Sequence, residues 1–315
     1  MRSIPEFENH VKLKDYGKNN AVWDKHKQSN NQVAQLVAKY DDSPRAKKNI
    51  EYLNNCAGYI SFAWYDVGED KPKFNLVQAS FCRKRMCPLC AWRRSLMLKA
   101  RFCKNIFDVM DKYPKARYIF LTLTVQNVPV SELRTTLKEM NIAFKRMYQL
   151  DVMKKYVLGF VRNVEVTRDK TVSDYCHPHF HIIIMVKSTY FQSGYINQEQ
   201  FTEIWKQCLR VTYKPIVYVK TVRSSADKSF VVKEMFKYCV KESDIQFDKW
   251  YLDVMKQLHR TKSISTSGAL KDIVKDLTEN DKSDMIHIND MELSKRLSEN
   301  INFQWVRPKR EYRRV

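Results

Sequence analysis

The sequence has little glycine, no long apolar run and no evident internal repeat. Only 6 of its 315 residues are glycine, which argues against a disordered or low-complexity chain. No apolar stretch reaches the ~18 residues that a transmembrane helix needs, and the opening MRSIPEFENHVKLKD lacks the pattern of a signal peptide. We therefore expect a globular, cytoplasmic protein with no membrane partner, built as one core domain with flanking additions.

Acidic residues are also in short supply. The chain has 35 Asp and Glu against 56 Lys and Arg, a formal net charge of +21. Such a surplus attracts polyanions through counterion release, so nucleic acid is the expected partner. The imbalance is greatest from Lys71 to Phe107, where ten basic residues occur and no acidic one. We expect this stretch to face DNA.

Disulfides do not explain the cysteines of this chain, because a protein without export features keeps its thiols reduced. Cys82, Cys87 and Cys90 follow the spacing C-x4-C-x2-C, which resembles the cysteine knuckles of structural zinc sites. Cys56 is the fourth ligand we choose. The alternative is a set of core thiols, since no fourth ligand lies close in sequence. Ordinary structural roles are expected for Cys103, Cys176, Cys208 and Cys239.

Basic residues surround this cysteine pattern. A folded zinc loop would present them together to DNA phosphates, which position a protein on nucleic acid. The plain alternative is a solvated charged face. The residues are Arg83, Lys84, Arg85, Arg93 and Arg94.

The apolar periodicity predicts an α+β fold, an antiparallel sheet with helices packed on it. Strands are expected at 117–125, 160–167, 179–187 and 216–222, and helices near 131–147, 201–209 and 228–242. The first fifty residues, apart from a helix at 31–40, are expected to be a solvated extension. The predicted organisation is an N-terminal cysteine-rich basic region at 1–110, a core domain at 111–250, and a linker with a small basic C-terminal element at 251–315.

Three histidines alternate along one predicted strand. His177, His179 and His181 are spaced by two, so their side chains project from the same face. The antiparallel neighbour carries Glu165 among valines, where a carboxylate is costly without a cation or hydrogen-bond partner. The set suits Mn²⁺ or Mg²⁺ beside a phosphate, although Zn²⁺ or Co²⁺ would also fit. The alternative is ordinary sheet-surface histidines, but three of only 7 in the chain fall within five residues.

The predicted helix at 228–242 carries Glu234, Tyr238 and Lys241 at i, i+4 and i+7. They therefore share one face. A tyrosine hydroxyl has an unperturbed pKa near ~10, so use as a nucleophile requires a nearby cation or base, which Lys241 can supply. Taken alone this triplet is weak evidence, because a surface tyrosine among charges is common.

Three segments in order resemble the motifs of HUH endonucleases, and most closely the rolling-circle plasmid replication initiators. They are TLT in FLTLTVQN, HFH in HPHFHIIIMV and YCVK in KYCVKESD, within about residues 118–244. The resemblance implies an RRM-like core with His179 and His181 as metal ligands. It also implies Tyr238 as the nucleophile and Lys241 as the lysine of the YxxK motif. Glu165 fits the place of a third ligand.

The activity that the resemblance implies is a site-specific nick in one strand at a plasmid origin. Tyr238 would become linked to the new 5′ end, and the free 3′ hydroxyl would prime a polymerase. The metal would polarise the scissile phosphate. The expected partners are origin DNA, single-stranded or in a hairpin, with host helicase and polymerase.

Other roles stay open. Glu234, one turn before Tyr238, could activate water or a 3′ hydroxyl during termination; its alternative is a surface salt bridge to Lys237 or Lys241. The enzyme could instead serve conjugative relaxation or transposition, although the compact size favours replication. A different class of function is a non-catalytic, zinc-containing DNA-binding regulator that binds but never cuts.

Overall fold

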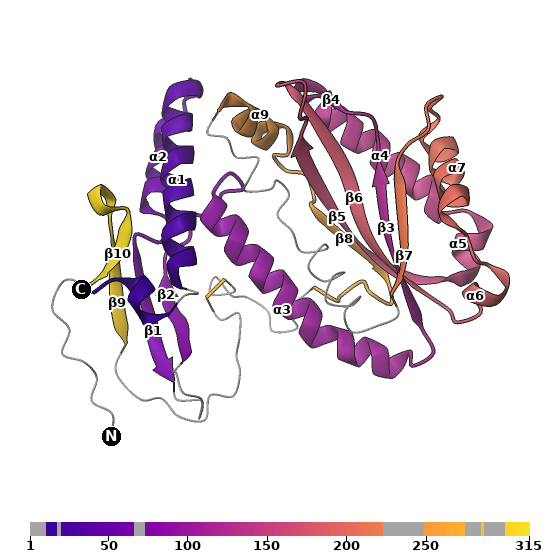
Figure 1. Ribbon diagram of the computed structural model, residues 1–315, viewed down its shortest axis with the longest axis horizontal. Helices are drawn as coiled ribbons and strands as arrows, with labels where there is room; N and C mark the ends of the chain where they lie inside the picture. The colour runs from indigo at the N-terminus through magenta and orange to yellow at the C-terminus, as the bar shows by residue number, and fades with distance from the viewer. Residues whose placement is uncertain (1–10, 18–19, 66–72, 223–247, 275–284, 287–299) are drawn as a thin grey trace. The chain divides into compact units, whose positions relative to one another are not determined.

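The computed structural model describes residues 11–17, 20–65, 73–222, 248–274, 285–286 and 300–315 (Figure 1). The chain divides into two compact units, Met1–Met97 with Thr278–Val315, and Leu98–Leu277. Each unit contains an antiparallel sheet accompanied by helices, which confirms the predicted α+β class. Among the described residues, no helix is both long enough and apolar enough to cross a membrane.

The first unit is built on a sheet with the strand order β10-β9-β1-β2. Its strands are β1 (Tyr59–Tyr65), β2 (Lys73–Ala79), β9 (Ile301–Val306) and β10 (Glu311–Arg314). Its helical segments are η1 (Leu13–Tyr16), α1 (Ala21–Tyr40), α2 (Ala46–Asn55) and η5 (Arg307–Lys309). Helix α3 (Pro88–Lys112) begins in this unit and ends in the other.

The N-terminal segment is not the solvated extension that its polar composition suggests. Helix α1 begins ten residues earlier than predicted, at Ala21, and buries Trp23, Val33 and Val37. The ring of Trp23 meets that of Phe62 on β1 edge to face at 5.7 Å. The prediction was wrong because a helix needs only one apolar stripe to join a core, whatever its remaining faces carry.

The C-terminal residues are not a separate element either. The structure divides the predicted 251–315 region between the two units, since β8 (Ile264–Gly268) pairs with β5 while β9 pairs with β1. Tyr312 on β10 is fully buried, and its hydroxyl donates to the carbonyl of Ala57 at 2.7 Å. The overlooked signal is the alternation of INFQWV, whose first, third and fifth residues are buried as in a half-buried strand.

The second unit contains the strands predicted from apolar alternation. They are β3 (Arg117–Thr124), β5 (Val157–Arg168), β6 (Tyr175–Val186) and β7 (Val217–Val222). The sheet order is β7-β3-β6-β5-β8, with the short β4 (Val128–Pro129) on β6. The helical segments are η3 (Val130–Glu132), α4 (Leu133–Tyr148), α5 (Asp151–Tyr156), α6 (Tyr190–Ser193), α7 (Gln198–Leu209) and α9 (Lys249–Gln257). The predicted helix at 228–242 lies outside the described residues.

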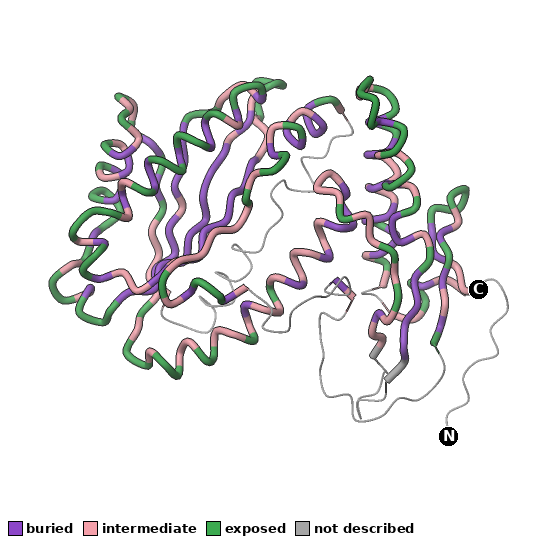
Figure 2. Tube along the Cα trace, turned by 180° about the vertical axis from the view of Figure 1, so that it is seen from behind, coloured by how far each residue is buried: buried purple, intermediate pink, exposed green. Residues whose placement is uncertain are grey.

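Strand β6 is the centre of this sheet and is buried on both faces for most of its length (Figure 2). On one face, the ring of Phe180 lies 6.3 Å from that of Phe144 on α4. On the other, Ile183 joins a buried cluster with Phe102 of α3. Because alternate residues share a face, His179 and His181 lie on the same side as Ile183. The histidine row therefore continues an apolar core.

Candidate metal centre

Three predicted ligands from two neighbouring strands converge on one point. In the antiparallel pairing of β5 with β6, Glu165 stands opposite His179, and Asn163 stands opposite His181. The Oε2 atom of Glu165 is 3.0 Å from Nε2 of His179 and 2.7 Å from Nε2 of His181. These three side chains can hold a metal ion. His177 lies on the same face but is outside this group.

The three ligands are buried. Glu165 is 1% exposed, His179 8% and His181 6%. Burial opposes ionisation of Glu165, but the hydrogen bonds from His179 and His181 outweigh it and hold the pKa of this carboxyl well below its usual range. Glu165 is therefore an anion at neutral pH, as a hard divalent cation requires of a carboxylate ligand.

The hydrogen bond of His179 to the backbone fixes where its proton resides. Its Nδ1 atom lies 3.2 Å from the carbonyl oxygen of His177, which can only accept. Nδ1 must therefore carry a hydrogen, so that Nε2 offers a lone pair to a cation once the proton it shares with the Glu165 carboxylate is displaced. Two lone pairs at that separation repel unless a proton or a cation lies between them. The backbone thus prepares His179 as a metal ligand.

Strand β3 orients the second imidazole. The Oγ1 atom of Thr122 lies 3.2 Å from Nδ1 of His181, its cross-strand neighbour. The ring of Phe120 stacks on His181 with centroids 5.6 Å apart. Thr124 has a different role, because its hydroxyl donates to the carbonyl of Ile216 at 2.8 Å. The sequence placed the TLT segment in a motif but did not reveal that only Thr122 supports a histidine; the strand register supplies that information.

The ligand atoms lie close enough together to contact a single ion. Two ligands at right angles about an ion at ~2.1 Å lie about 3.0 Å apart, and the two nitrogen–oxygen separations are 3.0 and 2.7 Å. Two imidazoles with one carboxylate form a mixed nitrogen and oxygen donor set that accepts Mn²⁺ or Mg²⁺ and also the borderline metals.

The family model for a replication protein matches residues 73–313, which include both strands of this centre. The chain belongs to the Rep_1 family of replication proteins. This membership confirms the resemblance to rolling-circle plasmid replication initiators that the three motifs indicated.

Curated relatives of this replication protein agree in name. A "Protein rep" of Streptococcus pneumoniae serotype 2 (strain D39 / NCTC 7466) is 32% identical over 249 residues, covering 76% of each chain. One from a Bacillus species is 35% identical, over 77% of this chain and 85% of the relative. One from Lactiplantibacillus plantarum is 31% identical, over 84% and 88%. No solved structure matches the chain.

The third motif and Glu234 lie in a part of the chain that the structure does not describe. Tyr238, Glu234 and Lys241 all lie in 223–247, outside the described residues. In this replication protein the roles of Tyr238 and Lys241 remain predictions carried by the motif, and the role of Glu234 remains a prediction from its helical spacing.

The basic residues near the cysteines divide into two kinds. Arg83 is exposed, and Lys84, Arg85 and Arg94 are partly exposed, as a phosphate-contacting set requires. Arg93 is buried, and its Nε donates to the carbonyl of Met285 at 2.9 Å. Its guanidinium also lies 5.2 Å from the ring centroid of Trp23. The prediction that Arg93 meets DNA is corrected, because its donors and its charge are used inside the first unit.

Proposed function

We propose that this protein initiates rolling-circle replication of a plasmid by nicking one DNA strand at the origin, with Tyr238 as the nucleophile. The observation that carries the proposal is the convergence of Glu165 on β5 with His179 and His181 on β6, the strand that contains the HFH motif, within hydrogen-bonding distance. Family membership supports plasmid replication, and the motif order supports the assignment of the tyrosine.

Glu165, His179 and His181 would hold one divalent ion, Mn²⁺ or Mg²⁺. When bound, the ion would polarise a scissile phosphate and offset the negative charge that develops during displacement. The protein's contribution is to fix the ligands. Thr122 and the carbonyl of His177 hold the outer nitrogens of the two imidazoles, which keeps both Nε2 atoms aimed at one place.

The bond changes balance without an external reagent. The Oη atom of Tyr238 attacks the phosphorus, a tyrosine–phosphate bond forms, and the bond from phosphorus to the 3′ oxygen breaks. The tyrosine proton leaves as the nucleophile forms, and the 3′ oxygen acquires one to become the hydroxyl that primes synthesis. Lys241, one turn along the expected helix, would stabilise the tyrosinate form. Glu234 would accept a proton from water or from a 3′ hydroxyl in the terminating step.

Exposed and partly exposed basic residues near the cysteine cluster would bind DNA. Arg83, Lys84, Arg85 and Arg94 would contact phosphates, and the net charge of +21 would steer association with the polyanion. Such contacts position the chain and do not read sequence. Affinity should therefore fall steeply with salt for origin and non-origin DNA alike.

The test uses supercoiled origin plasmid, Mn²⁺ and denaturing gels. Wild-type protein should convert the plasmid to a nicked form with protein attached to the 5′ end. A variant carrying His179→Ala and His181→Ala should bind DNA but fail to nick, whereas the exposed control His259→Ala should nick normally. Wild-type binding without cleavage would instead identify a non-catalytic regulator, and cleavage confined to a transfer origin or transposon end would identify a relaxase or transposase.

A further inference from the structure

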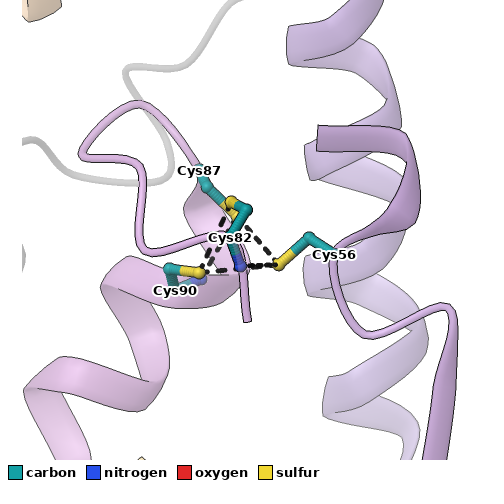
Figure 3. A group of neighbouring side chains, drawn as sticks. All are labelled: Cys56, Cys82, Cys87 and Cys90. Atoms are coloured by element: carbon teal, nitrogen blue, oxygen red, sulfur yellow. Dashed lines mark hydrogen bonds between the residues drawn. The ribbon is translucent and has the colours of Figure 1, made fainter. Parts of the chain in front are cut away.

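Four cysteine thiols meet inside the first unit, and none of these cysteines belongs to the proposed active site. Cys56, Cys82, Cys87 and Cys90 all place their sulfurs within 4.8 Å of one another, and Figure 3 shows the side chains pointing toward a common centre. Three of the four are buried, and Cys82 is partly exposed. The fourth partner, Cys56, is far from the knuckle in sequence but adjacent to it in the fold.

The sulfur spacing is that of a tetrahedral thiolate site. Four sulfurs at ~2.3 Å from a zinc ion lie about 3.8 Å from each other. The separations are 3.5 Å for Cys56–Cys90, 3.6 Å for Cys56–Cys87 and 3.7 Å for Cys82–Cys90. A disulfide would require about 2.05 Å between two sulfurs, so these thiols are spaced for an ion and not for a covalent bond.

The backbone around the cluster favours ionised sulfur. The amide of Cys82 donates to Sγ of Cys56, and the amide of Cys90 donates to Sγ of Cys87, each at 3.4 Å. Cys87 directly precedes helix α3, which begins at Pro88, and Cys90 lies in its first turn. The positive end of the helix dipole stabilises a thiolate at this position.

A buried lysine supplies a second, independent observation. Lys27 of α1 is fully buried, and its Nζ donates to the carbonyl of Cys56 at 2.5 Å and of Asn54 at 2.9 Å. No carboxylate pairs with it within the described part of the chain, although a buried charge needs a counter-charge. Ionised thiols of the sulfur cluster would supply the negative charge that balances Lys27.

We infer that Cys56, Cys82, Cys87 and Cys90 bind one Zn²⁺ as thiolates and that Lys27 neutralises part of the excess negative charge of this centre. Four thiolates exceed the charge of Zn²⁺ by two, and a buried cation beside the site reduces the cost of that excess. The ion fastens the end of α2, the segment after β2 and the start of α3 to one another. This assignment is independent of the proposed nicking activity.

The ligand set is tested in the full chain carrying His179→Ala and His181→Ala, so that the other centre does not contribute metal. Elemental analysis after dialysis should find about one zinc per chain. Adding Cys87→Ser should remove it, whereas Cys103→Ser, a partly exposed cysteine farther along α3, should not. Cys87→Ser can also unfold the unit, so a second measurement uses the chain that carries only His179→Ala and His181→Ala.

Cobalt exchanged into that protein should give the charge-transfer and ligand-field bands of tetrahedral cobalt thiolate. Release of the metal should expose four additional reactive thiols.

Lys27 is tested by chelator competition. Lys27→Met keeps the length of the side chain but removes its charge, and should weaken zinc binding at least about tenfold, a typical loss for an outer-shell partner. Lys25→Met, an exposed lysine on the same helix, should leave the affinity unchanged. Iron in place of zinc, disulfides among the four cysteines, or a protein free of stoichiometric metal would overturn the assignment. Equal zinc affinity in Lys27→Met and the control would overturn the role of Lys27.

Discussion

Glu165 stands directly opposite His179 in the pairing of β5 with β6, with Oε2 3.0 Å from Nε2 of the imidazole. The same register places His181 two residues along, where its Nε2 reaches the same oxygen. A shift of one residue would turn Glu165 to the opposite face of the sheet. The candidate metal centre is therefore a product of strand register, and its ligands depend on the sheet for their positions.

The carboxylate charge of Glu165 should decide metal affinity. Glu165→Gln keeps the size of the side chain but leaves a hard cation with two neutral imidazoles and a neutral amide, and with no anionic ligand. We expect Mn²⁺ affinity to fall by more than the ~10–100-fold typical of an outer-shell change. Titration calorimetry or manganese electron paramagnetic resonance measures this. An unchanged affinity would remove Glu165 from the ligand set.

Thr122 should support the centre without touching the ion. Thr122→Val removes the hydroxyl that faces Nδ1 of His181, and we expect Mn²⁺ affinity to fall about tenfold with the fold retained. The matched control is Thr124→Val on the same strand, whose hydroxyl donates to Ile216. That control should lower thermal stability and leave metal affinity unchanged. Equal affinities in the two variants would contradict the orienting role of Thr122.

Gly268 should be required for β8 to join the sheet of the second unit. Its φ is +58°, and a Cβ there would collide with the carbonyl oxygen of Leu158 and with Gly159. We expect Gly268→Ala to lower the free energy of unfolding by about 1–3 kcal/mol. Gly58→Ala is the control, since its Cβ would come no closer than 3.4 Å to Asn55. Denaturant unfolding compares them, and equal stability would mean that β8 contributes little.

Local patterns predicted much of the second unit. Apolar alternation located β3, β5, β6 and β7, and helical spacing from Leu133 to Met147 located α4. The spacing of His179 and His181 indicated a shared face, and Glu165 was identified from its burial among valines. These inferences succeeded because each depends on neighbours within one or two elements.

Long-range pairing could not be predicted in the same way. Nothing local in 301–314 indicates that these residues pair with β1, and the register of Ile60 with Phe303 joins segments far apart in sequence. Arg93 resembled its exposed neighbours until the fold placed it beside Trp23 and Met285. The burial of Lys27 could not be predicted either, because its Nζ atom contacts the carbonyl of Cys56 only in the folded chain.

Glu234 should matter only after the first cleavage. If it accepts the proton in termination, Glu234→Ala should form the tyrosine-linked intermediate at the normal rate and resolve it slowly, so that the covalent adduct accumulates. If its partner is merely a surface lysine, the loss should cost little stability and leave both steps nearly unchanged. Single-turnover cleavage followed by a chase separates these outcomes; normal decay of the adduct would exclude the role.

The most direct test of the central claim is to identify the residue that carries DNA. After cleavage of an origin oligonucleotide in Mn²⁺, the protein is digested and the nucleotide-bearing peptide is sequenced by mass spectrometry. We expect the nucleotide on Tyr238, no adduct with Tyr238→Phe, and normal adduct with Tyr195→Phe, a control whose side chain is exposed. DNA affinity should be nearly unchanged in both variants. A nucleotide on another residue, or cleavage retained by Tyr238→Phe, would contradict the account.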